Sequence, residues 1–176
     1  MTLTARGQKW LKGAHLVVAG TWVGAGACLN LMNFALTTGP EPSLHGRLLA
    51  MKFVDDFVII PCALGTLATA VAYATLTRWG WFRHWWVVTK WVVCVGGIVF
   101  GTFWLGPWLN GLPPVAQALG GEAAADRAYL LSVSRLRLWG SVQVASLVGA
   151  VFLSALKPWG RRPALPAGPS PEETRL

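Results

Sequence analysis

Three charged residues lie close together where a long apolar segment begins, in the stretch AMKFVDDFVIIPC at residues 50–62. Lys52 precedes Asp55 and Asp56 by three and four residues, the spacings at which side chains on one helix meet. Two carboxylates and an ammonium group in this position can neutralise one another, or can bind an ion or a small polar ligand. The stretch is therefore the first candidate site in the chain.

Two further cations extend this candidate site. Arg135 and Arg137 lie just before or within the last apolar segment, at the depth expected for the acidic stretch because both segments enter the membrane from the same side. The spacing predicts a charged cluster at one membrane surface, made of Lys52, Asp55, Asp56, Arg135 and Arg137. Two interpretations remain open, a ligand-binding or ion-binding cluster and a structural collar of salt bridges among the lipid headgroups.

A stripe of polar side chains follows the acidic stretch. At about 100° per residue, four side chains fall on the helix face of Asp55, within about 40° of it, namely Cys62, Thr66, Thr69 and Tyr73. Pro61 lacks an N–H and leaves the Phe57 carbonyl without its helical donor, so a kink is expected beside the acids. An inward stripe with a loosened turn suits a small ligand or an ion, and equally suits hydrogen bonding between helices.

Histidines supply a second candidate chemistry, at the opposite end of the helices. His15, Tyr73, His84 and Lys90 fall at similar depths in the predicted segments. Imidazole nitrogens are ligands of b-type haem and of copper, so His15 and His84 are candidate haem or metal ligands, with Lys90 a polar neighbour. His45 falls in an outer loop, where a solvated side chain is expected.

Enzyme motifs are lacking in the sequence. There is no glycine-rich phosphate loop, no serine nucleophile elbow and no HExxH stretch. Cys28, Cys62 and Cys94 fall in different apolar segments without a CxxC spacing, which is typical of small packing residues. The sequence therefore favours a protein that is not an enzyme and assigns no catalytic residue.

The elements that must position these residues follow from composition. Hydrophobic residues make up 54% of the chain and charged residues 12%, and the mean hydropathy is +0.49. Such a chain of 176 residues is too apolar for one soluble core. A bilayer takes about 20 apolar residues per helix, and the windows long enough are residues 13–36, 53–76, 86–109 and 136–156. We predict an all-α fold, a four-helix transmembrane bundle in residues 1–156.

Two boundaries of this bundle need separate treatment. The stretch AGAC at residues 25–28 resembles a lipoprotein-like cleavage site at Cys28, but the apolar run continues past it, which favours an uncleaved first helix. At the other end, Gly120 and Gly121 precede a helix-forming run, so the last helix is expected to begin near Glu122, outside the membrane. Residues 157–176 are rich in proline and predict a disordered cytoplasmic tail.

Charge predicts the orientation of the bundle. The N-terminus, the loop at 77–90 and the tail together carry ten Lys and Arg residues against two acids, whereas the other side carries five cations and five acids. The net charge of +8 thus lies on one face, and the positive-inside rule places both termini in the cytoplasm. A nucleic-acid partner is excluded because no soluble basic module exists. The expected partners are the lipid bilayer of a bacterial inner membrane and a second membrane protein.

Two family resemblances can be stated. The stretches FVIIPCALGTLATAVAYA, WGWFRHWWVVTKW and GTFWLGPWLNG together resemble a family of predicted bacterial integral membrane proteins of unknown function, over about residues 10–112. The first helix, KWLKGAHLVVAGTWVG, is similar to that of copper-resistance D-type membrane proteins. The first resemblance implies a four-helix membrane protein without an assigned activity, and the second implies copper chemistry near His15.

Three functional hypotheses follow. The leading one is a small inner-membrane protein that binds a partner, a small ligand or an ion through its outer charged cluster. The alternatives are a redox subunit that binds b-type haem or copper through His15 and His84, and a small transporter of protons or metal ions.

Overall fold

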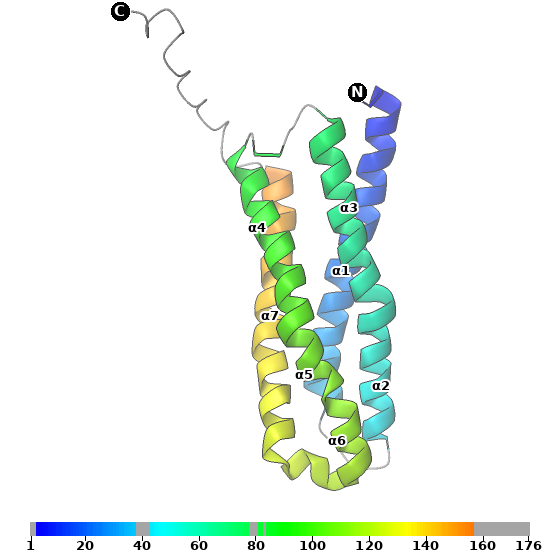
Figure 1. The fold of residues 1–176 in the computed structure, drawn as a ribbon, viewed down its shortest axis with the longest axis vertical. Helices are drawn as coiled ribbons and strands as arrows, with labels where there is room; N and C mark the ends of the chain where they lie inside the picture. The colour runs from blue at the N-terminus through cyan, green and yellow to red at the C-terminus, as the bar shows by residue number, and fades with distance from the viewer. Residues whose placement is uncertain (1–2, 38–42, 78–80, 83, 157–176) are drawn as a thin grey trace, which may run out of the picture.

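Long antiparallel helices make up the computed structural model of the protein, which describes residues 3–37, 43–77, 81–82 and 84–156 (Figure 1). Helix α1, Ala5–Leu36, begins after Thr4, whose hydroxyl oxygen accepts a 3.2 Å hydrogen bond from the Gly7 N–H. Such a cap satisfies one of the free N–H groups at a helix start. The predicted disordered tail at 157–176 lies outside the described residues.

The second long helix is interrupted at the acidic stretch. Helix α2, Leu44–Val54, passes into the π-helical turn η1, Asp55–Ile59, and continues as α3, Ile60–Leu76. Pro61 occupies the second position of α3, so a distortion arises where the missing N–H predicts one. The distortion is a one-residue π insertion, in which the Ile60 N–H bonds to the Asp55 carbonyl.

The third long helix repeats this construction. Helix α4, Trp85–Phe100, passes into the π-helical turn η2, Gly101–Leu105, and then into α5, Gly106–Asn110. Pro107 again follows the π turn, and a Cβ on Gly106 would lie 3.2 Å from the Gly101 carbonyl oxygen. A glycine before the proline therefore lets the widened turn close without a steric conflict.

The segment between the third and fourth predicted membrane windows, residues 110–135, is largely helical. Helix α6, Leu112–Leu119, is followed by the 3₁₀ turn η3, Gly120–Ala125, and the chain turns at Gly120 with a positive φ of 57°. Helix α7, Arg127–Leu156, begins five residues later than the predicted start near Glu122. The reason is Asp126, whose extended backbone breaks the helix and whose carboxylate accepts a 2.7 Å bond from the Tyr129 N–H.

These helices pack as an antiparallel bundle in which α1 contacts α3 and α7, while α4 packs on α7. The start of α1 and the end of α7 lie at the same end of the bundle (Figure 1). Within the described residues, four helices are long and apolar enough to cross a membrane: Ala5–Leu36, Leu44–Leu76, Trp85–Ala125 and Arg127–Leu156. The protein is thus a small polytopic membrane protein, as its composition predicts.

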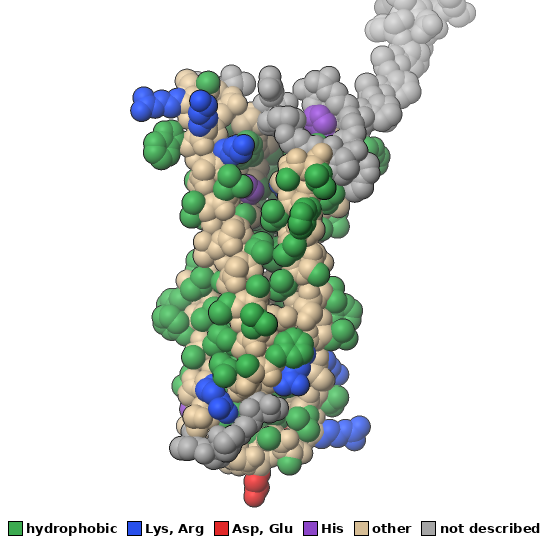
Figure 2. All heavy atoms as spheres, turned by 180° about the vertical axis from the view of Figure 1, so that it is seen from behind, with side chains coloured by type: hydrophobic (Ala, Val, Ile, Leu, Met, Phe, Trp, Pro, Cys, Tyr) green, Lys and Arg blue, Asp and Glu red, His purple; other side chains and the backbone are tan. Residues whose placement is uncertain are grey.

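Side-chain distribution fits a lipid environment. Figure 2 shows hydrophobic side chains along the length of the bundle, with Lys and Arg gathered towards its two ends. Large apolar side chains such as Val17, Phe57 and Phe103 are exposed on the helices, as expected where lipid is the solvent. Two buried clusters hold the helices together, one at the end formed by α2, α6 and α7 around Leu48 and Tyr129, and one at mid-height around Trp22.

Candidate functional site

A cavity of about 460 Å³ lies between the helices of the bundle and opens to the outside beside the exposed Ile60 and Leu64. All of the long helices line it, and both π-helical turns contribute to its wall. Most of the lining is apolar, including Trp22 and Met51. The polar lining residues, hereafter the polar wall, come from five different elements: Asn30, Asn33, Asp55, Thr102, Asn110 and Gln143.

The π-helical turns explain how polar groups reach this cavity. Each turn widens its helix by one residue, and each precedes a proline that donates no backbone hydrogen bond. Asp55 opens the first turn, and Gly101 and Thr102 open the second. The cavity is thus bordered by two places where a proline leaves a helix one backbone donor short.

Asp55 faces this cavity, whereas its neighbour Asp56 does not line it. The Lys52 ammonium donates to the Asp56 carboxylate at 2.6 Å, the only ion pair among the described residues. Both side chains of that pair are about one third exposed. Asp55 forms no hydrogen bond or direct ion pair within the described part of the chain, and it lies in a partly buried position near the Lys52 charge.

The two arginines of the predicted cluster lie against other partners. Arg135 is exposed, with its guanidinium carbon 5.6 Å from the centre of the Trp108 ring. Arg137 donates a 3.1 Å hydrogen bond from Nη2 to the Thr37 hydroxyl and lies 5.5 Å from the centre of the Phe34 ring. The structure therefore brings Lys52 and Asp56 together, and it places Asp55, Arg135 and Arg137 in three other environments.

Two asparagines of α1 belong to the site although the sequence analysis did not single them out as site residues. Asn33 is 3% exposed, and its Oδ1 is buried with no hydrogen-bond partner. Asn30 donates to the Ser141 hydroxyl at 3.0 Å, while its Oδ1 is also buried without a partner. Amides within an apolar membrane helix are costly unless paired, which is the sequence signal that marks them.

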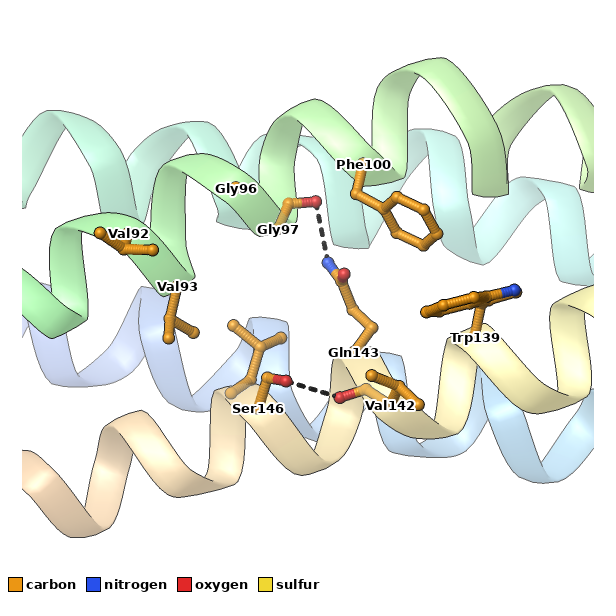
Figure 3. A pocket seen from close by; sticks show the side chains of 10 residues that line it. Val92, Val93, Gly96, Gly97, Phe100, Trp139, Val142, Gln143 and Ser146 are labelled. Atoms are coloured by element: carbon orange, nitrogen blue, oxygen red, sulfur yellow. Dashed lines mark hydrogen bonds between the residues drawn. The ribbon is translucent and has the colours of Figure 1, made fainter.

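Gln143 separates the central cavity from a smaller groove between α4 and α7. Its Nε2 donates a 2.9 Å hydrogen bond to the Gly97 carbonyl across the two helices (Figure 3). The groove, of about 240 Å³, and the cavity share Gly97, Gln143 and Leu147 in their walls. A Cβ at position 97 would lie 3.0 Å from the Gln143 amide nitrogen, so the small residue permits this contact.

The polar stripe of the second long helix faces α1 near the other end of the bundle. Thr66 donates to the Cys62 carbonyl at 2.7 Å, and Thr69 donates to the Gly65 carbonyl at 2.7 Å. The same Thr69 oxygen lies 2.8 Å from Nδ1 of His15 on α1. The one hydroxyl proton of Thr69 can be donated to a carbonyl or to Nδ1, so the donor in this contact depends on the tautomer of His15.

Tyr73 completes this stripe. The Tyr73 hydroxyl donates to the Gln8 carbonyl at 3.4 Å, and its ring meets the His15 ring edge-on at 6.1 Å. The expectation of a solvated His45 in a loop is wrong, since His45 lies in α2, half-buried, with Nδ1 3.0 Å from the Pro113 carbonyl oxygen. His84 precedes α4 at its N-cap position. Lys90 donates to the Ser154 hydroxyl at 2.6 Å. No group of three metal-binding side chains occurs among the described residues.

Comparison with known proteins adds no identity to this geometry. No family model, no curated protein and no solved structure matches the chain. The cavity and its polar wall are therefore the main indication of its function.

His15 offers a direct test of the haem and copper hypotheses. We expect His15→Ala to lower the free energy of unfolding by about 1 kcal/mol, because a single hydrogen bond between membrane helices is lost. Thr69→Val should cost a similar amount, and the double variant no more than either single one. Thermal unfolding in detergent measures these values. A Soret band or bound copper in the wild type that disappears in His15→Ala, but not in Thr69→Val, would show that His15 binds haem or copper and is more than a hydrogen-bonding residue.

Proposed function

We propose that the protein binds a small organic cation in its central cavity. The observation that carries this proposal is Asp55, which lines the cavity while Lys52 neutralises Asp56 instead. A carboxylate in such a place is costly unless a positive charge accompanies it. A cationic ligand supplies that charge.

Hydrogen-bonding capacity in the polar wall points to the same kind of ligand. The buried Oδ1 atoms of Asn30 and Asn33 have no hydrogen-bond partner, and the Asp55 carboxylate lines the same cavity. The Gln143 amide N–H, a potential donor, is already bonded to the Gly97 carbonyl. These oxygen acceptors can bind a ligand rich in donors, such as an ammonium group.

Cavity size and lining favour an organic ligand over a bare metal ion. Pockets for small molecules have volumes of about 300 to 1,000 Å³ and mostly apolar walls with a few polar groups, and the cavity of about 460 Å³ fits this description. Trp22 adds an aromatic ring that can attract a cation. A metal ion would instead need several oxygen, nitrogen or sulfur ligands converging on one point.

The groove between α4 and α7 suggests how such a ligand enters. It adjoins the cavity through Gln143, whose hydrogen bond to Gly97 joins the two helices. A ligand with an apolar body dissolves in the membrane and can approach the bundle from the lipid side. Rotation of one glutamine side chain then connects the groove with the cavity.

Binding of phenethylammonium tests the proposal, because this ion carries an ammonium group on a small apolar body. We expect it to raise the unfolding temperature of the purified protein in mild detergent. The neutral isostere 2-phenylethanol, of the same shape, should raise it far less. Equal effects of the charged and neutral molecules would show that the cavity does not select a cation.

Transport is the second candidate, favoured by polar side chains at both ends of the bundle interior. Asp55 lies towards one end, and the His15–Thr69 and Lys90–Ser154 pairs lie towards the other. Uptake of phenyltrimethylammonium into proteoliposomes distinguishes the two functions, since this permanently charged ion crosses lipid poorly. Binding without uptake would restrict the protein to a binding role.

Orientation in the membrane determines which side Asp55 serves. We expect reporters fused after residue 156 and in the loop at 77–84 to read cytoplasmic, and one in the segment at 113–125 to read external, because ten cations lie on the first side. Moving one charge should not invert the protein. A periplasmic location of the C-terminal reporter would contradict the predicted orientation.

A further inference from the structure

Two arginines and a tyrosine lie on the helices that pack around the C-terminal end of α1, and none of them belongs to the polar wall. The Tyr129 hydroxyl donates a 2.6 Å hydrogen bond to the Thr37 carbonyl, and Arg137 donates to the Thr37 hydroxyl. Arg47 lies near the start of α2, which packs against α1. Leu44 and Leu48, which flank Arg47 along the helix, pack in one buried cluster with Tyr129.

The guanidinium groups here have donors to spare. Nε and Nη2 of Arg47 and Nε of Arg137 are buried with no hydrogen-bond partner. Neither arginine forms an ion pair within the described residues, where the single pair is Lys52–Asp56. A buried charged donor left unpaired costs more than a neutral one. Among the described residues, the arrangement therefore lacks an anion.

A phosphate group matches these donors best. Guanidinium groups present planar forks of N–H donors that bind phosphate oxygens in pairs, and two cations suit its charge. The site also lies at an end of the bundle, near the first turn of α2 and the last turn of α1. Phosphate groups of lipids lie at that depth, and basic pockets between membrane helices bind them.

We propose that Arg47 and Arg137 form a binding site for a phosphate group, beside Tyr129 at the end of α1. The phosphate belongs to an anionic lipid headgroup or to a free phosphate ion. This site is independent of the cation proposed for the cavity, because it shares none of the residues of the polar wall. It would join α1, α2 and α7 through one bound anion.

Thermal unfolding of the full chain in neutral detergent tests the site. Phosphatidylglycerol should stabilise the wild type, whereas diacylglycerol, which lacks the phosphate, should not. Arg47→Gln and Arg137→Gln should each weaken the lipid affinity by about tenfold or more, because charge-assisted hydrogen bonds are lost. Arg135→Gln is the matched control, since it removes the same charge from an exposed side chain over the Trp108 ring.

Inorganic phosphate in a parallel titration separates the two sources. Stabilisation by phosphatidylglycerol alone assigns the site to lipid, and stabilisation by inorganic phosphate that Arg47→Gln abolishes assigns it to the free ion. Arg47→Lys keeps the charge but lacks the fork, so it provides a folded variant with reduced affinity should Arg47→Gln unfold. Absence of stabilisation by both compounds would overturn the proposal, as would equal losses in Arg135→Gln and Arg47→Gln.

Substitution of Glu41 is a second test of the proposed phosphate site. This acid lies in the segment 38–42, outside the described residues, between α1 and α2. If its carboxylate supplied the missing anion, Glu41→Gln would create a phosphate-dependent or lipid-dependent stabilisation that the wild type lacks. The proposal requires the opposite, a wild type that responds to phosphate and a Glu41→Gln variant that responds similarly.

Discussion

Asp55→Asn is expected to weaken the binding of phenethylammonium by about 30-fold or more. The estimate follows from the cost of removing one partner of a buried charge pair, about 2 kcal/mol at the lower limit. Asparagine keeps the size of the side chain and one oxygen acceptor, so the shape of the cavity should persist. Isothermal titration of the purified variant in detergent measures the loss.

Asp56→Asn provides the matched control for this experiment. It removes the same charge from the neighbouring residue, whose carboxylate already pairs with Lys52 at about one third exposure. Exposed pairs contribute about 0 to 1 kcal/mol, so ligand affinity should change by less than about fivefold. If the two variants lost affinity equally, the effect would come from the overall charge of the stretch, and Asp55 would have no special role.

The helical bundle itself could be predicted from the sequence, because the apolar windows are long and carry few charges. What composition could not supply was the exact length of each helix. The second long helix begins at Leu44, nine residues before the window that starts at residue 53, because His45, Arg47 and Lys52 lower the hydropathy there without interrupting the helix. Asp126 set the start of α7, a capping signal present in the sequence that the glycines at 120 and 121 obscured.

The site was predicted in part. Asp55 and its proline were identified because a charge and a proline are conspicuous in an apolar run, and the structure adds a π-helical turn at that place. The spacing left the partner of Lys52 open between Asp55 and Asp56, and only the three-dimensional arrangement selects Asp56. The equivalent turn at Gly101 contains no charged residue, and Pro107 is the one feature of the sequence that could have predicted it.

Uncharged amides were not predicted as site residues, because the prediction relied on charged side chains; they are Asn30, Asn33 and Gln143. Each is a single uncharged amide within an apolar run, and none lies in a recognisable motif. Their importance comes from long-range pairing, such as the 3.0 Å bond from Asn30 to Ser141. Arg47 was missed for a related reason, since it counted only as a loop cation, whereas it lies on α2 between Leu44 and Leu48, which pack with Tyr129.

Tyr129 should give the largest loss of stability among single substitutions at the end of the bundle formed by α2, α6 and α7. It is 1% exposed and packs with Leu44, Leu48 and Val133. Tyr129→Ala removes a large buried aromatic side chain, for which the expected cost is about 3 to 5 kcal/mol. Reversible denaturation in mixed micelles, followed by far-UV circular dichroism, measures this free energy of unfolding.

Tyr129→Phe separates the hydrogen bond from the packing. The ring remains, but the Thr37 carbonyl loses its 2.6 Å donor in a residue that is 0% exposed, and an unsatisfied buried acceptor costs about 1 to 3 kcal/mol. Leu131→Ala is the control in the same helix, since Leu131 is 45% exposed and surface changes cost about 0.5 kcal/mol or less. Equal losses for the Phe and Ala variants would assign the stability to the hydrogen bond. A Phe variant as stable as the wild type would show that α1 ends beside α7 through packing alone, without the tyrosine hydroxyl.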